Sequence, residues 1–369
     1  MKIVFIGGRD VKNIGGIENY MYNLATQLVK KGHEPIVFCE SDHNGEERLN
    51  GFRVIYMKGP KSNLICKPWV GLKATLKTIF SIRNVDVIHY NGWAPSLASP
   101  IASLFGKRSL QQGHGFGWQR TKYSPKQQKI MKFMEKMASK FNRNLIMCSD
   151  EQTQYFKEHY HKNPVTISTA INLPEDDKFL STEILKKFGI VSKRYFLFMA
   201  RLINDKNPDF LIKAFNLAKI EGYQLVIAGN NTSAPKYVEY LHTLAKDNPN
   251  IIFTDAVFGE DKEVLFRNAF AFCLPSTIEG MSISLLEAMS YKLPIIASSI
   301  PANQEVLPKD QALWVTPENV EELTDALKEG IRRKDWFTKT TFSNFERVRN
   351  NYTWDKVSDK YIYYLNGII

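Results

Sequence analysis

Apolar runs that suit buried strands alternate with amphipathic segments that suit helices, and this alternation restricts the fold more than any other feature of the 369-residue chain. Such alternation is typical of a mainly parallel, doubly wound α/β sheet. It is interrupted by a polar stretch near Ser168–Lys193 and then starts again. The length suffices for two domains that each bury a core. We therefore expect two α/β domains, residues 1–170 and residues 190–352.

The expected strands are short apolar runs bounded by glycine, proline or polar residues. In the first half they are Lys2–Ile6, Pro35–Cys39, Phe52–Met57, Val85–Tyr90, Arg108–Gln112 and Asn144–Cys148. In the second half they are Tyr195–Ala200, Gln224–Ala228, Ile251–Thr254, Ala269–Leu274 and Ile295–Ser298.

The net charge of +11 is confined to the first half of the chain. Residues 1–180 hold 26 Lys and Arg against 15 Asp and Glu, whereas residues 181–369 hold 23 of each kind. The two halves therefore face different partners, or the first half meets a polyanion. A nucleic-acid-binding protein is one interpretation, but no recognised nucleic-acid motif accompanies the charge.

The four cysteines, Cys39, Cys66, Cys148 and Cys273, show no C-x-x-C spacing, and we interpret them as core thiols of a reducing compartment. The apolar run at the amino terminus is too short for a signal peptide, and no stretch approaches the 18 apolar residues of a membrane span. The sequence thus predicts a cytoplasmic protein.

The stretch Cys273–Ser299 combines a strand, a polar turn and a helix in a way that predicts a ligand site. Ser282 is a suitable N-cap for a helix of about ten residues. That helix is apolar nearly all round, yet it contains Glu287. A buried carboxylate must meet a cation, a hydrogen-bond donor or a ligand hydroxyl. A structural ion pair and a ligand contact both remain open. Glu279 lies eight positions earlier, beside a glycine turn.

The run E-G-M-S-I-S-L-L-E-A-M from Glu279 to Met289 resembles the E-x7-E signature of the retaining glycosyltransferases of family 4. A second segment supports this resemblance. Arg201 and Lys206 lie in A-R-L-x-x-x-K-N-P-D, directly after an expected strand. Two cations at the end of a strand create a positive site without a metal. The alternative is a solvated pair of side chains.

The chain opens with a βαβ pattern whose helix begins at Gly15-Gly16. The glycines do not follow G-x-G-x-x-G, so a dinucleotide site is a weaker interpretation. A plain turn is a further one. In glycosyltransferases of the GT-B fold, a glycine pair at this place lets the backbone approach a phosphate or the acceptor.

The segment from His114 to Lys122, H-G-F-G-W-Q-R-x-K, resembles the H-G-x-x-W-Q-R-x-K-W pattern of polysaccharide-assembling bacterial members of family 4. It departs from that pattern at Tyr123, where those members often have tryptophan. By the resemblance His114 contacts the donor sugar, and Trp118 and Arg120 shape the acceptor side. The alternative for His114 is an ordinary loop position.

Residues 120–143 form a strongly basic amphipathic segment, with eight Lys and Arg against the single Glu135. Its apolar residues recur at helical spacing: Ile130, Phe133, Met134, Met137 and Phe141. One interpretation is a solvated basic face above a buried apolar stripe. The other is a surface that meets anionic lipid or a diphosphate-linked acceptor.

The resemblance covers nearly the whole chain and implies the GT-B fold, in which two Rossmann-like domains face each other across a cleft. The last helix, 353–369, then packs back on the first domain. The implied activity is metal-independent, retaining transfer of a hexosyl or deoxyhexosyl group in capsule or other cell-surface polysaccharide synthesis.

The implied donor is a UDP-, GDP- or dTDP-linked sugar, and the implied acceptor is a glycan or a polyprenyl-diphosphate-linked oligosaccharide. No cofactor, metal or nucleic acid is expected, and the location is cytoplasmic or peripheral at the inner face of a bacterial membrane. The catalytic residues are Arg201, Lys206, Glu279 and His114, and the donor-binding residues are Gly15, Gly16, Gly229, Gly280, Met281, Ser282 and Glu287. A GT-B epimerase or hydrolase acting on the same nucleotide sugar is the alternative enzyme.

Overall fold

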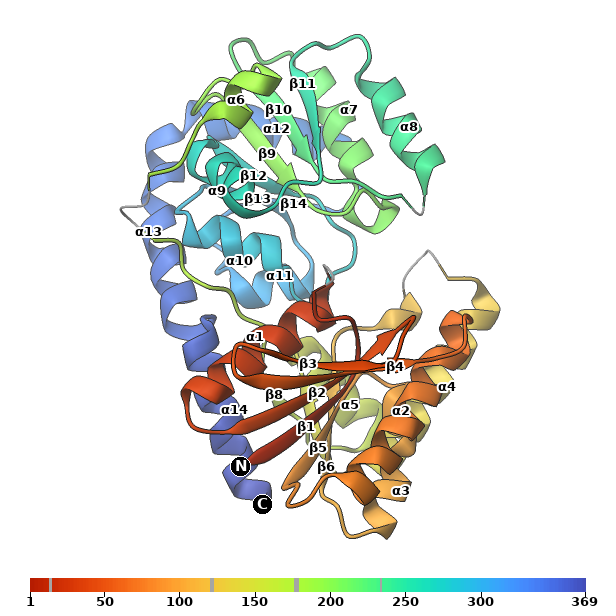
Figure 1. Ribbon diagram of the computed structural model, residues 1–369. Coiled ribbons are helices and arrows are strands. Elements are labelled where there is room, and N and C mark those ends of the chain that lie inside the picture. The colour runs from red at the N-terminus through yellow and green to blue at the C-terminus, as the bar shows by residue number, and fades with distance from the viewer. Residues whose placement is uncertain (13–14, 120–122, 176–178, 233) are drawn as a thin grey trace. The chain divides into compact units, whose positions relative to one another are not determined.

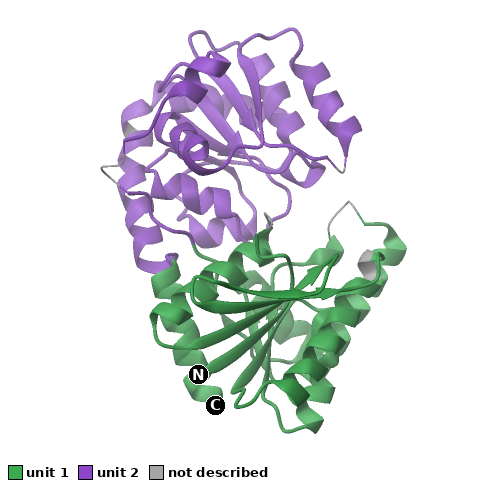
Figure 2. Cartoon of the chain, viewed as in Figure 1, with its two compact units in different colours: residues 1–170, 354–369 green, residues 171–353 purple. Residues whose placement is uncertain are grey.

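The chain folds into two compact units, which Figure 2 shows in separate colours. Unit 1 consists of Met1–Ala170 together with Trp354–Ile369, and unit 2 consists of Ile171–Thr353. The computed structural model describes residues 1–12, 15–119, 123–175, 179–232 and 234–369.

Unit 1 is built on an eight-stranded sheet whose order is β3-β4-β2-β1-β5-β6-β7-β8. The hairpin β3–β4 is antiparallel and the other neighbours are parallel. The strands are β1 (Lys2–Arg9), β2 (Glu34–Ser41), β3 (Gly45–Leu49), β4 (Phe52–Lys58), β5 (Val87–Asn91), β6 (Ser109–Gly113), β7 (Asn144–Met147) and β8 (Val165–Thr166).

Helices cover both faces of this sheet (Figure 1). They are α1 (Gly16–Lys30), α2 (Asn63–Ser81), η1 (Pro95–Ala98), α3 (Ser99–Leu104), η2 (Gly117–Gln119), α4 (Pro125–Phe141), α5 (Asp150–Tyr160) and α14 (Trp354–Ile368). Alternate residues of β1 point to opposite faces. Phe5 packs in a core with Tyr20 of α1 and Tyr361 of α14, whereas Val4 packs in a core with Val70 of α2. The final helix thus belongs to the core of unit 1.

Unit 2 contains a parallel six-stranded sheet of order β11-β10-β9-β12-β13-β14. Its strands are β9 (Tyr195–Met199), β10 (Gln224–Ala228), β11 (Ile251–Asp255), β12 (Ala271–Leu274), β13 (Ile295–Ser298) and β14 (Leu313–Val315). Its helices are α6 (Glu183–Phe188), η3 (Asn204–Lys206), α7 (Pro208–Ala218), α8 (Pro235–Ala245), α9 (Gly259–Asn268), α10 (Ile283–Ser290), α11 (Pro301–Val306), α12 (Val320–Arg332) and α13 (Lys334–Asn351). The expectation of a doubly wound α/β architecture is confirmed for both units.

Each sheet reverses its winding direction at one point. In unit 2 the chain runs outward from β9 to β10 and β11, and then returns to place β12 on the other side of β9. In unit 1 the same reversal occurs between β1 and β5. The loops at the carboxyl ends of the strands diverge at such a switch point, and ligands of open α/β sheets bind there.

Several local features differ from the sequence expectations. The short strands β3, β8 and β14 were not expected, and α10 has eight residues rather than about ten. Residues 171–189, which we had left between the domains, belong to unit 2: the Ile171 N–H donates to the Tyr352 carbonyl at 2.9 Å.

All four cysteines are buried and free, as expected. None of the described helices is long and apolar enough to cross a membrane.

Candidate active site

The two loops at the switch point of unit 2 carry Arg201, Lys206 and Glu279. Arg201 is exposed shortly after the end of β9, and the η3 turn then places Lys206 beside the loop that follows β12. Asn207 ends this loop in the left-handed conformation, with φ of 51°, and α7 begins at Pro208. An asparagine tolerates this conformation better than most residues, so the sharp entry into α7 suits the sequence.

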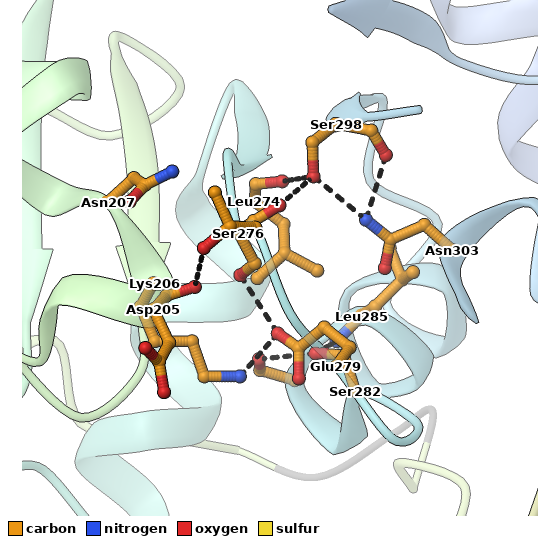
Figure 3. Close-up of polar contacts among 12 residues, drawn as sticks. Asp205, Lys206, Asn207, Leu274, Ser276, Glu279, Ser282, Leu285, Ser298 and Asn303 are labelled. Atoms are coloured by element: carbon orange, nitrogen blue, oxygen red, sulfur yellow. Dashed lines mark hydrogen bonds and ion pairs between the residues drawn. The ribbon is translucent and has the colours of Figure 1, made fainter. Parts of the chain in front are cut away.

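Hydrogen bonds join the loop after β9 to the loop after β12 (Figure 3). The Asn207 side-chain amide donates to the Pro275 carbonyl at 2.9 Å, and the Thr277 N–H donates to the Asp205 carbonyl at 3.0 Å. Asp205 and Asn207 are buried. Buried polar groups bonded in this way fix the two loops against each other before any ligand binds.

Lys206 and Glu279 form an ion pair between these loops (Figure 3). The side chain of Lys206 is 16% exposed and that of Glu279 is 5% exposed. The Ser276 hydroxyl donates a further hydrogen bond to the Glu279 carboxylate at 2.9 Å. Because the pair is nearly buried, both side chains are held in defined positions at the rim of the sheet.

The loop after β12 is also anchored from behind, by residues that the sequence analysis did not select. The Ser298 hydroxyl, at the end of β13, donates to the Ser276 carbonyl, and the Asn303 side-chain amide donates to the Ser298 carbonyl at 2.9 Å (Figure 3). These polar side chains are fully buried. They support the turn that presents Glu279, and no motif signals them because their partners are backbone carbonyls distant in sequence.

The amino end of α10 follows the turn at Glu279 and Gly280. Ser282 is the N-cap, as expected, and its hydroxyl accepts a hydrogen bond from the Leu285 N–H at 3.3 Å. Met281 is half-buried and packs against the core of the unit. The positive end of the helix dipole therefore lies close in sequence to the Lys206–Glu279 pair, and such an end favours an anionic ligand.

Glu287 is half-buried, rather than fully buried as we had expected. Its carboxylate forms an ion pair with Lys262 of α9 at 2.7 Å, with 34% of the Lys262 side chain and 19% of the Glu287 side chain exposed. The cation that the sequence argument required is thus present. Lys262 had no distinguishing signal in the sequence, because it is 25 residues away and on another helix.

Gly229, expected at the donor site, has a structural reason to be glycine. A Cβ at this position would lie 2.0 Å from the Ala200 carbonyl oxygen. The close approach joins the end of β10 to the residue before Arg201. The glycine therefore helps to fix the path of the cationic loop.

In unit 1, Gly15 and Gly16 begin α1 next to the end of β1. Gly15 is the N-cap, and the Glu18 carboxylate in the first turn accepts a hydrogen bond from the Arg9 N–H at 2.9 Å. A Cβ added to Gly16 would have no atom within 4 Å. Backbone is therefore accessible at this turn, as the approach of a ligand requires.

His114 lies after β6 in a largely buried polar environment. Its Nε2 atom is 3.0 Å from Asn91 Oδ1, and the ring of Tyr20 meets it edge-on with centroids 5.0 Å apart. Burial, with a smaller effect of the Lys67 charge, lowers the pKa of His114 to about 3. The imidazole is therefore neutral near pH 7 and can donate or accept a hydrogen bond, but it supplies no positive charge.

Trp118 lies in the η2 turn and is held by α4. Its indole N–H donates to the Glu135 carboxylate at 3.0 Å, and the Lys132 ammonium lies 4.5 Å from the ring centroid. Tyr160 of α5 donates to the other oxygen of Glu135 at 2.9 Å. The indole N–H is thus occupied within the fold. Arg120, the other expected acceptor-side residue, lies outside the described residues.

The apolar side of α4 is not a buried stripe, which corrects one sequence expectation. Ile130, Phe133 and Phe141 are exposed, whereas Glu135 is fully buried. The hydrogen bonds of Glu135 turn its side of the helix inward. A carboxylate satisfied by two donors can occupy this position, and the large apolar side chains then face outward.

Comparison with known proteins gives two family matches that together span most of the chain. The family described as Glycosyltransferase Family 4 matches residues 14–175, and the family described as Glycosyl transferases group 1 matches residues 181–337. An uncharacterized glycosyltransferase of Methanocaldococcus jannaschii is 26% identical, covering 94% of this chain and 92% of its own length.

A second relative agrees in length, and a solved structure agrees in fold. The GDP-mannose-dependent alpha-(1-6)-phosphatidylinositol monomannoside mannosyltransferase of Mycobacterium tuberculosis is 22% identical, over 96% of this chain and 95% of that protein. The solved structure of sucrose-phosphate synthase from Thermosynechococcus elongatus superposes with a TM-score of 0.84 at 17% identity, covering 100% of this chain and 98% of that one.

The two doubly wound units and these matches define the chain as a glycosyltransferase of the GT-B fold. It belongs to the family 4 group, with the family 4 domain in the first half and the group 1 domain in the second.

Proposed function

We propose that this enzyme transfers a hexosyl or deoxyhexosyl group, with retention of anomeric configuration, from a nucleoside-diphosphate sugar. The acceptor is a hydroxyl of a glycan or of a polyprenyl-diphosphate-linked oligosaccharide in bacterial capsule or other cell-surface polysaccharide synthesis. The single observation that carries the proposal is the Lys206–Glu279 ion pair at the switch point of unit 2. It joins the cationic loop and the E-x7-E segment into one site.

The diphosphate of the donor requires positive charge as it departs. In our proposal Arg201, Lys206 and the N–H groups at Met281 and Ser282 supply this charge, which stabilises the leaving group most strongly in the transition state. Two cations and a helix terminus can do this without a divalent ion. Unchanged turnover after chelation is the expected result, and loss of turnover with EDTA that Mg²⁺ restores would contradict metal independence.

We propose front-face attack at the anomeric carbon, with the following bond changes. The bond between C1 and the phosphate oxygen breaks, and the acceptor oxygen forms its bond to C1 on the same face of the sugar. The acceptor proton passes to the departing phosphate oxygen. Glu279 would hydrogen-bond the sugar hydroxyls and Glu287 the ribose, while Gly229 and Gly280 keep the backbone of these loops close. Gly15, Gly16 and the neutral His114 would contribute from unit 1, His114 toward the donor sugar.

The acceptor side is proposed to lie on unit 1, near Trp118 and Arg120. The excess positive charge of the first half supports an acceptor that carries phosphate or lies at an anionic surface. We propose that the enzyme works in the cytoplasm, at the inner face of the membrane, through residues 120–143. Its relative from Mycobacterium tuberculosis is named for a phosphatidylinositol monomannoside.

A thermal-shift panel of UDP, GDP, dTDP and their sugar derivatives tests the donor. A ligand at 100 times its Kd stabilises the fold by about 2.7 kcal/mol, so the correct nucleotide should give a distinct shift. With that donor, NMR of the product anomer tests retention. Release of free sugar or of an epimer without an acceptor would identify a hydrolase or epimerase instead, and no shift with any nucleotide would contradict the proposal.

A further inference from the structure

Exposed apolar side chains are concentrated on three consecutive helices of unit 1, α2, α3 and α4. Of the 18 large hydrophobic side chains exposed among the described residues, nine lie on these helices or directly after α3. We name these nine the apolar patch: Ile65, Trp69, Leu76, Phe80, Leu104, Phe105, Ile130, Phe133 and Phe141. A concentration of this kind marks an interaction surface rather than the usual scatter of single residues.

The three helices provide a continuous surface. α3 contacts both α2 and α4, and Figure 1 shows the three side by side along one edge of the unit. The rings of Phe80 and Phe105 meet edge-on with centroids 5.4 Å apart, which joins the α2 part of the patch to the α3 part. Phe80 is nevertheless 69% exposed.

On α2 the patch is a regular stripe. Ile65, Trp69, Leu76 and Phe80 fall within an arc of about 60° at 100° per residue, and Lys73 lies directly beside this arc. Val70, Ala74 and Thr78, on the other side of the helix, are buried, and so is Cys66 between the two sides. The helix therefore has a buried side that holds the fold and a second apolar side, edged by Lys73, that faces outward.

On α4 the outward side has the same mixed character. Phe133 is 61% exposed and Phe141 is 43% exposed, and lysines separate them along the exposed arc. The inward side is fixed by the buried Glu135 and its hydrogen bonds to Trp118 and Tyr160. The exposure of the apolar residues is thus a consequence of the packing of α4.

The segment that contains these three helices carries a large excess of positive charge. Residues 63–141 contain 13 Lys and Arg and two acidic residues, an excess equal to the net charge of +11 of the whole chain. Glu135 is fully buried, and Asp86 accepts a hydrogen bond from the Lys2 N–H at 2.7 Å. Among the lysines of these helices, Lys132 lies near Glu135 and Lys77 lies near Glu46 of β3, and α2, α3 and α4 carry no further acidic residue.

From this combination we infer that α2, α3 and α4 form a membrane-docking surface, in which the apolar patch enters the interfacial layer of an anionic bilayer and the surrounding lysines contact its headgroups. Aromatic side chains favour the interface, and basic residues around them favour anionic lipid. The inference deepens the membrane role in the proposed function: contact is hydrophobic as well as electrostatic, and it extends from α4 to α2 and α3.

Other occupants fit the surface less well. A second copy of the chain would bring two strongly basic surfaces together, which is unfavourable. A nucleic acid would match the charge, and its bases could stack on the aromatic side chains of the patch. The other four patch residues, Ile65, Leu76, Leu104 and Ile130, are aliphatic and offer no face on which a base can stack, whereas a lipid interface accommodates both kinds.

Vesicle co-sedimentation without donor or acceptor tests the inference separately from sugar transfer. Wild type is compared on phosphatidylcholine vesicles and on vesicles containing about 30% phosphatidylglycerol, at low salt and in about 0.5 M NaCl. We expect binding to the anionic vesicles that persists in part at high salt, because burial of apolar side chains is not screened. Equal recovery with neutral and anionic vesicles, or release of wild type at high salt, would overturn the inference.

Three variants separate the contributions. The apolar variant Phe80→Ser/Phe105→Ser/Phe133→Ser should bind at low salt but lose at least about tenfold in vesicle partition at high salt. The charge variant Lys126→Gln/Lys129→Gln/Lys136→Gln/Lys140→Gln should lose its preference for anionic lipid. The control Phe258→Ser/Phe342→Ser/Tyr363→Ser removes exposed rings outside α2, α3 and α4 and should bind like wild type.

Trp69 provides a direct readout, since it is 47% exposed in the centre of the α2 stripe. Brominated lipids should quench part of the tryptophan fluorescence of wild type, and Trp69→Phe should remove that quenching while binding persists. Quenching that is unchanged in Trp69→Phe, a dimer that the apolar variant abolishes, or displacement from vesicles by oligonucleotides would each overturn the docking of this surface on lipid.

Discussion

The ammonium group of Lys206 and the carboxylate of Glu279 form a nearly buried ion pair, although 73 residues separate them in sequence. They meet because β9 and β12 are neighbours at the point where the sheet of unit 2 reverses its winding. The topology thus brings the two sequence motifs into one site. Neither charge can be removed without leaving the other poorly compensated.

Replacing Lys206 by alanine should lower kcat by on the order of 10²-fold or more, because the departing diphosphate loses a charge partner. Loss of one partner of a buried pair also costs stability, about 3–5 kcal/mol where burial is complete. Turnover is therefore measured per folded protein, at a temperature where circular dichroism shows the variant to be folded. Lys246→Ala, on the exposed end of α8, is the matched control. Near-normal turnover in folded Lys206→Ala would remove its role.

Glu287→Gln should weaken donor binding more than it affects folding. Its ion pair with Lys262 is partly exposed and contributes at most about 1 kcal/mol to stability, so the structural cost is small. Lys262→Met removes the same ion pair but keeps the carboxylate. Calorimetry with donor and nucleoside diphosphate should therefore show a lower binding affinity only for Glu287→Gln. Equal losses in both variants would assign binding to the pair, and unchanged affinity would leave Glu287 structural.

The sequence was sufficient to predict where most strands lie and which motifs follow them, because apolar periodicity and turn residues are local signals. β9, β10 and β12 lie close to their expected ranges, and the cationic loop and E-x7-E segment follow strands as expected. The pattern also predicted α4, but it assigned the wrong side to the interior. Periodicity shows on which side of a helix the apolar residues lie, but not which side packs against the rest of the protein. The burial of Glu135, with hydrogen bonds from two donors, could therefore not be foreseen.

Partners distant in sequence account for the other features that were missed. Lys262, Ser298 and Asn303 belong to no recognisable sequence motif. Their roles depend on contacts that form only when α9, β13 and α11 pack in the folded unit. The strand β14 has only three residues, too few for an alternating pattern. The roles of individual site residues stay predictions, which the variants described here test.

Gly229→Ala should destabilise unit 2 by about 1–3 kcal/mol, because the added Cβ would lie 2.0 Å from the Ala200 carbonyl oxygen. Relief of this contact requires movement of the backbone next to Arg201, so kcat should fall as well. Denaturation monitored by circular dichroism and steady-state kinetics measure the two effects. A variant with wild-type stability would show that the loop adapts freely.

Gly16→Ala, unlike Gly229→Ala, should lower activity without lowering stability. No atom lies within 4 Å of the new Cβ, so the folded protein should keep its stability or gain about 0.4–1 kcal/mol from the less flexible unfolded chain. If a phosphate or the acceptor approaches this backbone, the methyl group occupies its place and kcat/KM falls. Unchanged kinetics in this variant would assign Gly16 to an ordinary helix start.

Glu135 should make the stability of the α4–α5 region depend on pH. Burial raises the pKa of this carboxyl above its ordinary value of 4.5, and the hydrogen bonds from Tyr160 and Trp118 offset only part of that effect. The folded state therefore binds the proton more tightly than the unfolded state. The resulting stability is fully present below about pH 4.5 and is lost as the pH rises through the folded-state pKa.

Glu135→Gln has no carboxyl to ionise, so it should not lose stability in this way. Hydrogen exchange of the amides in α4 and α5 is compared for wild type and variant at the same pH, which cancels the intrinsic exchange rate. From about pH 5 to about pH 8 the free energy of local opening should fall in wild type relative to that in the variant. Glu158→Gln, an exposed residue of α5 whose carboxylate accepts from Gln154, is the control and should follow wild type. If wild type and Glu135→Gln kept a constant difference over this range, the buried carboxyl would not titrate there, and its pKa would not be raised by burial.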